Sequence, residues 1–163
     1  MFIVKWFAIF AGIFAVIAML IGELGLLRGR TPDSLGVRDG RLKPPSSKPN
    51  SVSSQTSLYP DHKMRRYADI APLAVKGDGP ATIERLAHIV EKMPGARIVK
   101  RGPGYLYAQF TSHMMKFVDD TEFWFDPVAN LVHVRSAARI GRSDFGVNRK
   151  RVESIRALLA AAR

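Results

Sequence analysis

The first thirty residues, MFIVKWFAIFAGIFAVIAMLIGELGLLRGR, are apolar almost throughout. Residues 6–22 carry no charge and lie between Lys5 and Glu23, and the apolar character resumes just after this acid. At about 1.5 Å of helix per residue, such a segment is long enough to cross a hydrocarbon core of roughly 30 Å. The pattern therefore predicts one transmembrane helix within residues 1–28, which holds the protein in a lipid bilayer.

A cleaved signal peptide is the main alternative for this segment, because it also has a short apolar run near the amino terminus. A signal peptide normally ends in small residues before its cleavage site, whereas this run ends in GLLRGR, residues 25–30. The sequence therefore favours an uncleaved anchor and a single-pass protein of the bacterial inner membrane. The orientation stays open, because the basic residues after the span favour a cytoplasmic domain. The short tail before the span is, by contrast, typical of an exported domain.

The segment that follows the anchor, residues 29–49, is rich in proline, serine and glycine and shows little apolar periodicity. This composition predicts a flexible tether that leads to a domain spanning residues 50–163. In the alternative interpretation, the second half of the segment lies ordered on the domain surface. Composition alone favours the tether.

Within the domain, the periodicity changes from that of a helix to that of strands and back. Gly79-Pro80 is typical of a helix start, and Met93-Pro94-Gly95 of a helix end. A last helix is expected from about Phe145 to Ala162, with Ser143 or Asp144 as its cap. Between the helices lie four segments of alternating character, residues 96–100, 104–112, 117–125 and 131–138. Their short connections predict a four-stranded antiparallel sheet with two helices packed on it, an α+β domain.

One carboxylate, Asp119, falls on the aromatic and therefore core-facing side of the third predicted strand. A buried carboxylate is costly without a cation, so we expect Asp119 to pair with Arg151 or Arg139. Arg151 is a suitable partner because it lies within the apolar arc of the last helix.

The opposite side of the same strand carries Asp120 and Glu122. His133 and Arg135 point to that side from the next strand, so we expect a cross-strand ladder of charges on the outer face of the sheet. This interpretation is favoured over a pair of catalytic carboxylates.

The net charge of the chain indicates which classes of partner it can attract. The chain carries 25 Lys and Arg against 14 Asp and Glu, a net charge of +11, which favours anionic partners such as lipid headgroups or nucleic acid. Nucleic acid is less favoured, because the basic residues are not interleaved with aromatic residues and no nucleic-acid motif is present. The chain has no cysteine and its four histidines are scattered, so we predict no cofactor and no metal site.

The densest basic segment is RSAARIGRSDFGVNRKR, residues 135–151, around the predicted start of the last helix. A helix start offers free N–H groups and positive potential, which suits a bound anion. The alternative is a capped helix with solvated arginines. The candidate residues for an anion or ligand site are Arg139, Arg142, Ser143, Asp144, Gly146, Asn148 and Arg149.

Three motifs in this order point to a known family: N-S-V-S-S-Q from Asn50, F-T-S-x4-F-x-D-D-x-E-F from Phe110, and V-R-S-A-x-R-x-G-x-S-D-x-G-x-N-R-x-R from Val134. They resemble the bacterial and plastid family called domain of unknown function 1499, over about residues 35–159. Members are often membrane-anchored or lipoprotein-like, and this resemblance implies an exported domain. Members commonly carry a pair of cysteines where this sequence has Pro45 and Ser51. The family has no established activity, so the resemblance implies no reaction.

Two functions stay open at this point. The first is a non-enzymatic, membrane-tethered accessory or binding domain, whose ligand is a membrane-protein partner, an anionic lipid or a small anion near the bilayer. The alternative is a hydrolase-like enzyme that uses Ser53, Ser54 or Ser143 with a nearby Asp or His. The sequence contains no nucleophile elbow, zinc-protease motif or phosphate loop, so it favours the binding domain.

Overall fold

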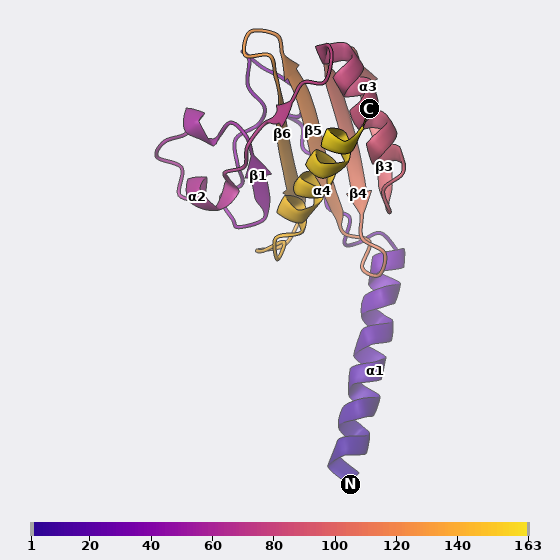
Figure 1. Cartoon of the computed structure of the whole chain (residues 1–163). Helices are drawn as coiled ribbons and strands as arrows, with labels where there is room; N and C mark the ends of the chain where they lie inside the picture. The colour runs from indigo at the N-terminus through magenta and orange to yellow at the C-terminus, as the bar shows by residue number, and fades with distance from the viewer. Residues whose placement is uncertain (1, 163) are drawn as a thin grey trace.

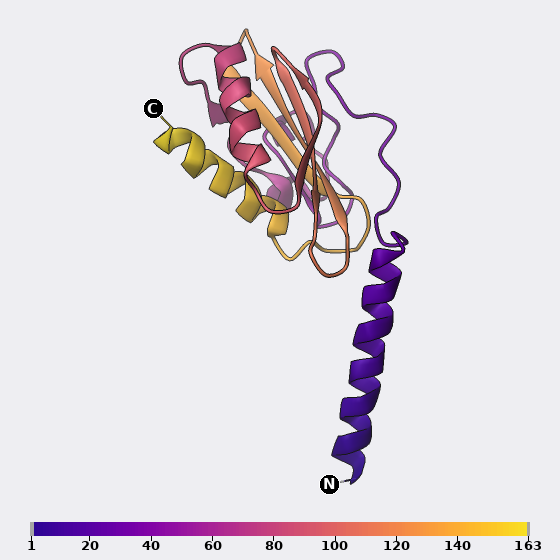
Figure 2. The same ribbon diagram turned by 90° about the vertical axis from the view of Figure 1, so that its right-hand side faces the viewer.

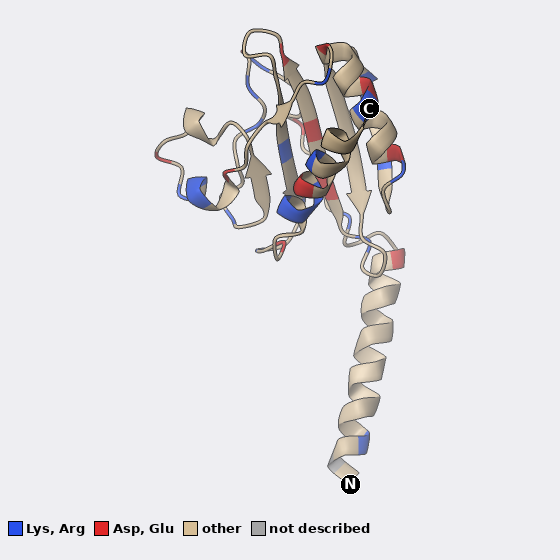
Figure 3. Cartoon of the chain, viewed as in Figure 1, with Lys and Arg blue, Asp and Glu red and all other residues tan. Residues whose placement is uncertain are grey.

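The computed structural model of the protein describes residues 2–162 and shows a long helix followed by an α+β domain (Figure 1). Helix α1 (Phe2–Glu23) extends away from the domain, and its large apolar side chains are exposed. Among the described residues, it is the one helix long and apolar enough to cross a membrane, a property that signal sequences share. Figure 3 shows its charged residues at its two ends only, where Lys5 and Glu23 lie.

The domain is built on one sheet of six strands in the order β1-β6-β5-β4-β3, with β2 also paired to β6. All the pairings are antiparallel. Helices α3 (Gly79–Glu91) and α4 (Val147–Ala161) cover one face of this sheet (Figures 1 and 2). The short helices η1 (Thr56–Leu58) and α2 (Arg65–Ala68) lie beside its β1 edge. The strands are β1 (Ser51–Ser53), β2 (Leu73–Ala74), β3 (Ala96–Gly102), β4 (Tyr105–Thr111), β5 (Val118–Asp126) and β6 (Leu131–Ala138).

The sequence predicted four strands, and the sheet has six. The four predicted segments correspond to β3, β4, β5 and β6, with ends that differ by a few residues. The additional strands β1 and β2 are three and two residues long, too short for an alternating pattern to be read from the sequence. Both are strands only because they pair with β6, so the prediction of four strands was incomplete.

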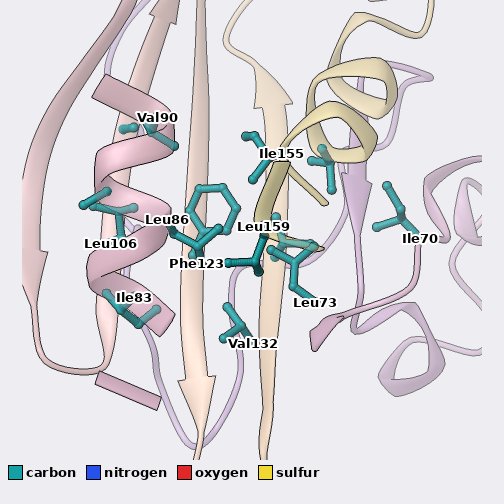
Figure 4. Packing of buried hydrophobic residues seen from close by; sticks show 14 of the residues in the cluster. Ile70, Leu73, Ile83, Leu86, Val90, Leu106, Phe123, Val132, Ile155 and Leu159 are labelled. Atoms are coloured by element: carbon teal, nitrogen blue, oxygen red, sulfur yellow. The ribbon is translucent and has the colours of Figure 1, made fainter. Parts of the chain in front are cut away.

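The hydrophobic core lies between the two helices and the sheet (Figure 4). Helix α3 begins at Gly79-Pro80 as predicted, where the Asp78 side chain accepts a hydrogen bond from the Ala81 amide at 2.6 Å. Each large apolar side chain buried here stabilises the fold by about 1.5–3 kcal/mol. The helices and the sheet contribute the fully or almost fully buried side chains of Ile83, Leu86, Val90, Leu106, Phe123, Val132, Ile155 and Leu159.

The other face of the sheet is covered by the segment that joins α1 to β1. Leu42 is 1% exposed, and the Gly36 amide donates to Glu122 Oε1 at 2.6 Å. Arg135 Nε donates to the carbonyl of Pro44 at 3.2 Å. Residues 36–49 therefore lie ordered on the sheet, in contrast to the free tether that composition favoured. Backbone groups and one deep leucine make these contacts, and neither produces a periodic pattern.

This cover buries the ladder of charges that was expected on the outer face of the sheet. Asp120, Glu122 and Arg135 are 1%, 0% and 4% exposed, respectively. Arg139 forms a bidentate pair with Asp120, with N–O distances of 2.8 and 2.9 Å. Glu122 accepts from the hydroxyl of Tyr105 at 2.7 Å. The ladder thus lies on the sheet face away from α3 and α4, within the interior of the domain, because residues 36–49 enclose it.

Candidate functional site

The start of α4 is organised around the carboxylate of Asp144. This group accepts hydrogen bonds from the amides of Gly146 and Asn148, at 3.1 and 3.0 Å, and from the hydroxyl of Tyr67 at 2.7 Å. Burial acts to raise the pKa of Asp144, but these hydrogen bonds outweigh it and hold the pKa below its usual value. Burial and the same carboxylate raise the pKa of Tyr67 to about 12. The N-cap residue of α4 is Gly146, two residues later than predicted, and the Asp144 carboxylate binds the first amides of the helix from the preceding loop.

This internal carboxylate occupies the position where an external anion was expected. Arg149 donates to the carbonyl of Tyr67, and Asn148 is fully buried, with its side-chain oxygen bonded to Ser136 and Arg151. Arg139 lies on the opposite face of the sheet with Asp120. Of the candidate side chains in this segment, Arg142 and Ser143 remain exposed. The structure thus uses most of the candidate residues to build the helix start.

Asp119 meets Arg151 on the helix-covered side of the sheet. Their closest N–O distance is 2.7 Å, and the guanidinium lies 4.4 Å from the ring centroid of Phe110. Arg151 also donates to the side-chain oxygen of Asn148 at 2.6 Å. Burial raises the pKa of Asp119 above its usual value, although Arg151 opposes this shift. The pair joins α4 to the start of β5.

Two cavities adjoin this pair, and we call them the edge cavities. The larger, of about 610 Å³, opens between the end of α3 and the start of α4, beside the β4–β5 loop. The smaller, of about 310 Å³, extends to the loop that precedes α4. Because they share Ser112, Phe117, Asp119 and Val147, the two cavities lie side by side. Sequence reasoning missed them, because their walls come from segments far apart in the chain.

The last turn of α1 packs against the same end of the domain. Lys116 Nζ in the β4–β5 loop lies 2.9 Å from Glu23 Oε1. A Cβ atom added at Gly22 would lie 2.9 Å from the carbonyl oxygen of Met115, so the two backbones approach too closely for a larger residue. Figures 1 and 2 both show α1 leaving the domain at the end where the β4–β5 loop and the start of α4 lie.

We call residues 112–117 and 139–147 the anchor-side edge of the domain. It exposes large apolar side chains: Met114 is 60% exposed, Phe145 is 89% exposed, and Phe117 and Val147 are also open to solvent. Phe145 has a φ of +50°, a left-handed conformation that bulky residues rarely adopt. The edge therefore presents apolar groups next to the end of an apolar helix.

A serine and a histidine meet on the other face of the sheet. Ser54 Oγ lies 3.1 Å from His133 Nδ1, and His133 Nε2 lies 3.7 Å from Asp126 Oδ2. Ser54 Oγ also accepts from the Val134 amide at 2.9 Å, which extends the pairing of β1 with β6. The imidazole stacks on Trp124, and burial lowers the pKa of His133, which favours the neutral ring. This arrangement contains the serine, histidine and aspartate of a hydrolase triad, but the Ser54 hydroxyl already accepts a backbone hydrogen bond within the sheet.

The other serine candidates make local backbone contacts. The hydroxyls of Ser53 and Ser143 accept from the amides of Gln55 and Phe145, both at 3.2 Å. Among residues 2–162, no cluster of three or more His, Asp or Glu side chains is arranged to hold a metal ion.

Neither a curated protein nor a solved structure matches the chain. A family model described as a protein of unknown function, DUF1499, matches residues 41–159. This range includes every strand of the sheet, all of α3 and nearly all of α4. The match thus extends over most of the folded domain, and the chain belongs to the DUF1499 family.

Proposed function

We propose that this protein is a non-enzymatic, single-pass membrane protein whose domain rests on the bilayer and binds anionic lipid headgroups. One observation carries the proposal: the last turn of α1 packs against the β4–β5 loop through Gly22 and Glu23. A spanning helix ends at the bilayer surface, so the residues that touch its last turn lie at that surface. In this account, the anchor-side edge is the part of the domain that meets the lipid.

The side chains of this edge suit such a contact. Exposed aromatic and apolar groups such as Met114 and Phe145 partition into the interfacial region of a bilayer. Arg142 and Lys150 are exposed near them, and Arg28 and Arg30 follow α1 within seven residues of its end. Each basic residue near an anionic surface contributes about 1 kcal/mol of attraction. The excess of positive charge then binds the anionic surface of the membrane rather than a nucleic acid.

We also propose that the membrane is the bacterial inner membrane and that the domain lies on its periplasmic side. The resemblance to membrane-anchored and lipoprotein-like proteins supports this side. The basic residues after α1 favour the cytoplasmic side instead. In the periplasmic orientation, these residues bind headgroups of the outer leaflet. Alkaline phosphatase fused after Arg163 is expected to be active, whereas a cytoplasmic domain would leave it inactive.

Hydrogen–deuterium exchange of the full chain in nanodiscs tests lipid binding. We expect residues 112–117 and 139–146 to exchange more slowly in nanodiscs with anionic lipid than in zwitterionic ones. Replacing Arg142 and Lys150 together with glutamate should remove this difference, because the headgroups would then be repelled. Glu substitutions at Arg97 and Lys100, exposed residues of β3, provide a control of equal charge change. Equal exchange in the two lipids would contradict the proposal.

The contact of Ser54 with His133 favours a second candidate function, a serine hydrolase. If Ser54 were a nucleophile, a fluorophosphonate probe would label it, and Ser54→Ala would abolish labelling. Because the Ser54 hydroxyl already accepts from Val134, we expect no labelling of the wild-type chain and a loss of stability in Ser54→Ala. Labelling at Ser54 would replace the binding function with the enzymatic one.

A further inference from the structure

We propose that the edge cavities bind one acyl chain of a bilayer lipid, whose headgroup stays at the domain surface. The inference rests on the proposed function and names the ligand of the same edge. The larger cavity falls within the roughly 300–1,000 Å³ typical of ligand sites. The smaller cavity adjoins it, so the two together offer an elongated space.

The walls of the cavities suit a hydrocarbon chain. Met93, Phe110, Phe117 and Val147 contribute apolar surface to the larger cavity. Most of the charged groups in the walls already have partners. Asp119 is bound to Arg151, Lys116 lies 2.9 Å from Glu23, and Asp144 accepts hydrogen bonds from Tyr67 and the start of α4. A hydrocarbon chain can therefore enter without leaving these charges unpaired, which is the main cost of bringing an apolar group against polar ones.

The charges around the cavities indicate where the headgroup lies. Lys150 lines the larger cavity from the exposed side of α4, and among the described residues it forms no ion pair. His113 and Lys116 line the same cavity from the β4–β5 loop. Asp119 lies in the walls of both cavities, but its pairing with Arg151 leaves no net charge there, so the headgroup is attracted to Lys150 instead. This arrangement favours a chain inside the cavities and an anionic headgroup beside Lys150.

The position of the cavities favours a bilayer lipid over a protein segment. The β4–β5 loop that lines the larger cavity also touches the last turn of α1, through Met115 and Lys116. Phe117 and Val147, shared by both cavities, are 38% and 47% exposed, so the apolar wall continues to the surface. A lipid beside α1 is thus the apolar ligand closest to the opening.

Photo-crosslinking tests the inference with the full chain in vesicles that contain a phospholipid with a diazirine at the end of one acyl chain. We expect adducts within residues 110–119 and 147–154. Ser154→Trp should reduce them several-fold, because Ser154 is exposed and lines the larger cavity, so the indole narrows the cavity without disturbing the core. Ala157→Trp is the matched control: Ala157 is exposed on the same helix and lines neither cavity, and the yield should be unchanged.

The outcomes separate this inference from the proposed function. Adducts confined to α1, or an equal yield in Ser154→Trp and wild type, would overturn the acyl-chain site. The exchange difference between anionic and zwitterionic nanodiscs does not require an occupied cavity. Its persistence in Ser154→Trp would show that headgroup binding holds even where the acyl-chain site fails.

Discussion

Replacing Asp119 with alanine is expected to lower the free energy of unfolding by about 3–5 kcal/mol. Asp119 is 9% exposed and forms an ion pair with Arg151 at 2.7 Å. The substitution leaves the guanidinium largely buried without its counter-charge, and the cost of that unpaired charge dominates the effect. The loss should exceed that from removing an exposed ion pair, which contributes about 0–1 kcal/mol.

Urea unfolding of the full chain in detergent, followed by circular dichroism, measures this effect. The matched control is Glu153→Ala, which removes an exposed carboxylate paired with Arg156 on the same helix. We expect the control to unfold within about 1 kcal/mol of wild type. Equal midpoints for Asp119→Ala and wild type would show that the pair does not support the fold.

The second large effect is expected at Leu42. Leu42→Ala should lower the free energy of unfolding by about 2–5 kcal/mol, because the residue is 1% exposed and the deletion leaves a cavity. Its amide also donates to the side chain of Gln55 at 2.8 Å, which fixes the backbone at this point. The prediction is informative because a leucine in a free tether would contribute almost nothing.

Leu58→Ala is the control, since it makes the same chemical change at a side chain that is 41% exposed. We expect it to cost less than about 1 kcal/mol, as surface substitutions usually do. Thermal unfolding of the two variants side by side gives the comparison. If both variants unfold at the temperature of wild type, residues 36–49 do not belong to the folded domain.

Much of the fold could be predicted from local patterns. Alternation identified β3 to β6, and Gly79-Pro80 marked the start of α3, because these signals depend on neighbouring residues. Strand β1 could not be found in this way, since three residues carry too little pattern and its pairing partner lies more than eighty residues later. The sequence did not predict that residues 36–49 cover Glu122 and Arg135. Backbone amides and carbonyls of this segment make the contacts, and sequence patterns do not show which partners these groups bind.

The candidate site, too, could be predicted only in part from local sequence patterns. Strand alternation and the helical arc together indicated Arg151 as one of two partners for Asp119, and they meet in the structure. The sequence predicted an anion site around Asp144. It could not show that this carboxylate binds Tyr67, 77 positions earlier, because no local pattern marks that contact. The edge cavities depend on how α3, α4 and the β4–β5 loop meet, which only the packed structure reveals.

The depth of single labels in a bilayer shows whether the anchor-side edge rests on the membrane. The chain has no cysteine, so Phe145→Cys and Val128→Cys each offer one attachment point for a fluorophore. The two side chains are 89% and 95% exposed, and the β5–β6 turn that carries Val128 lies at the end of the sheet away from α1 (Figure 1). Quenching is measured with nitroxide-labelled lipids in vesicles that hold the full chain. We expect strong quenching at position 145 and almost none at position 128. Equal quenching at both positions would show that the anchor-side edge does not rest on the membrane.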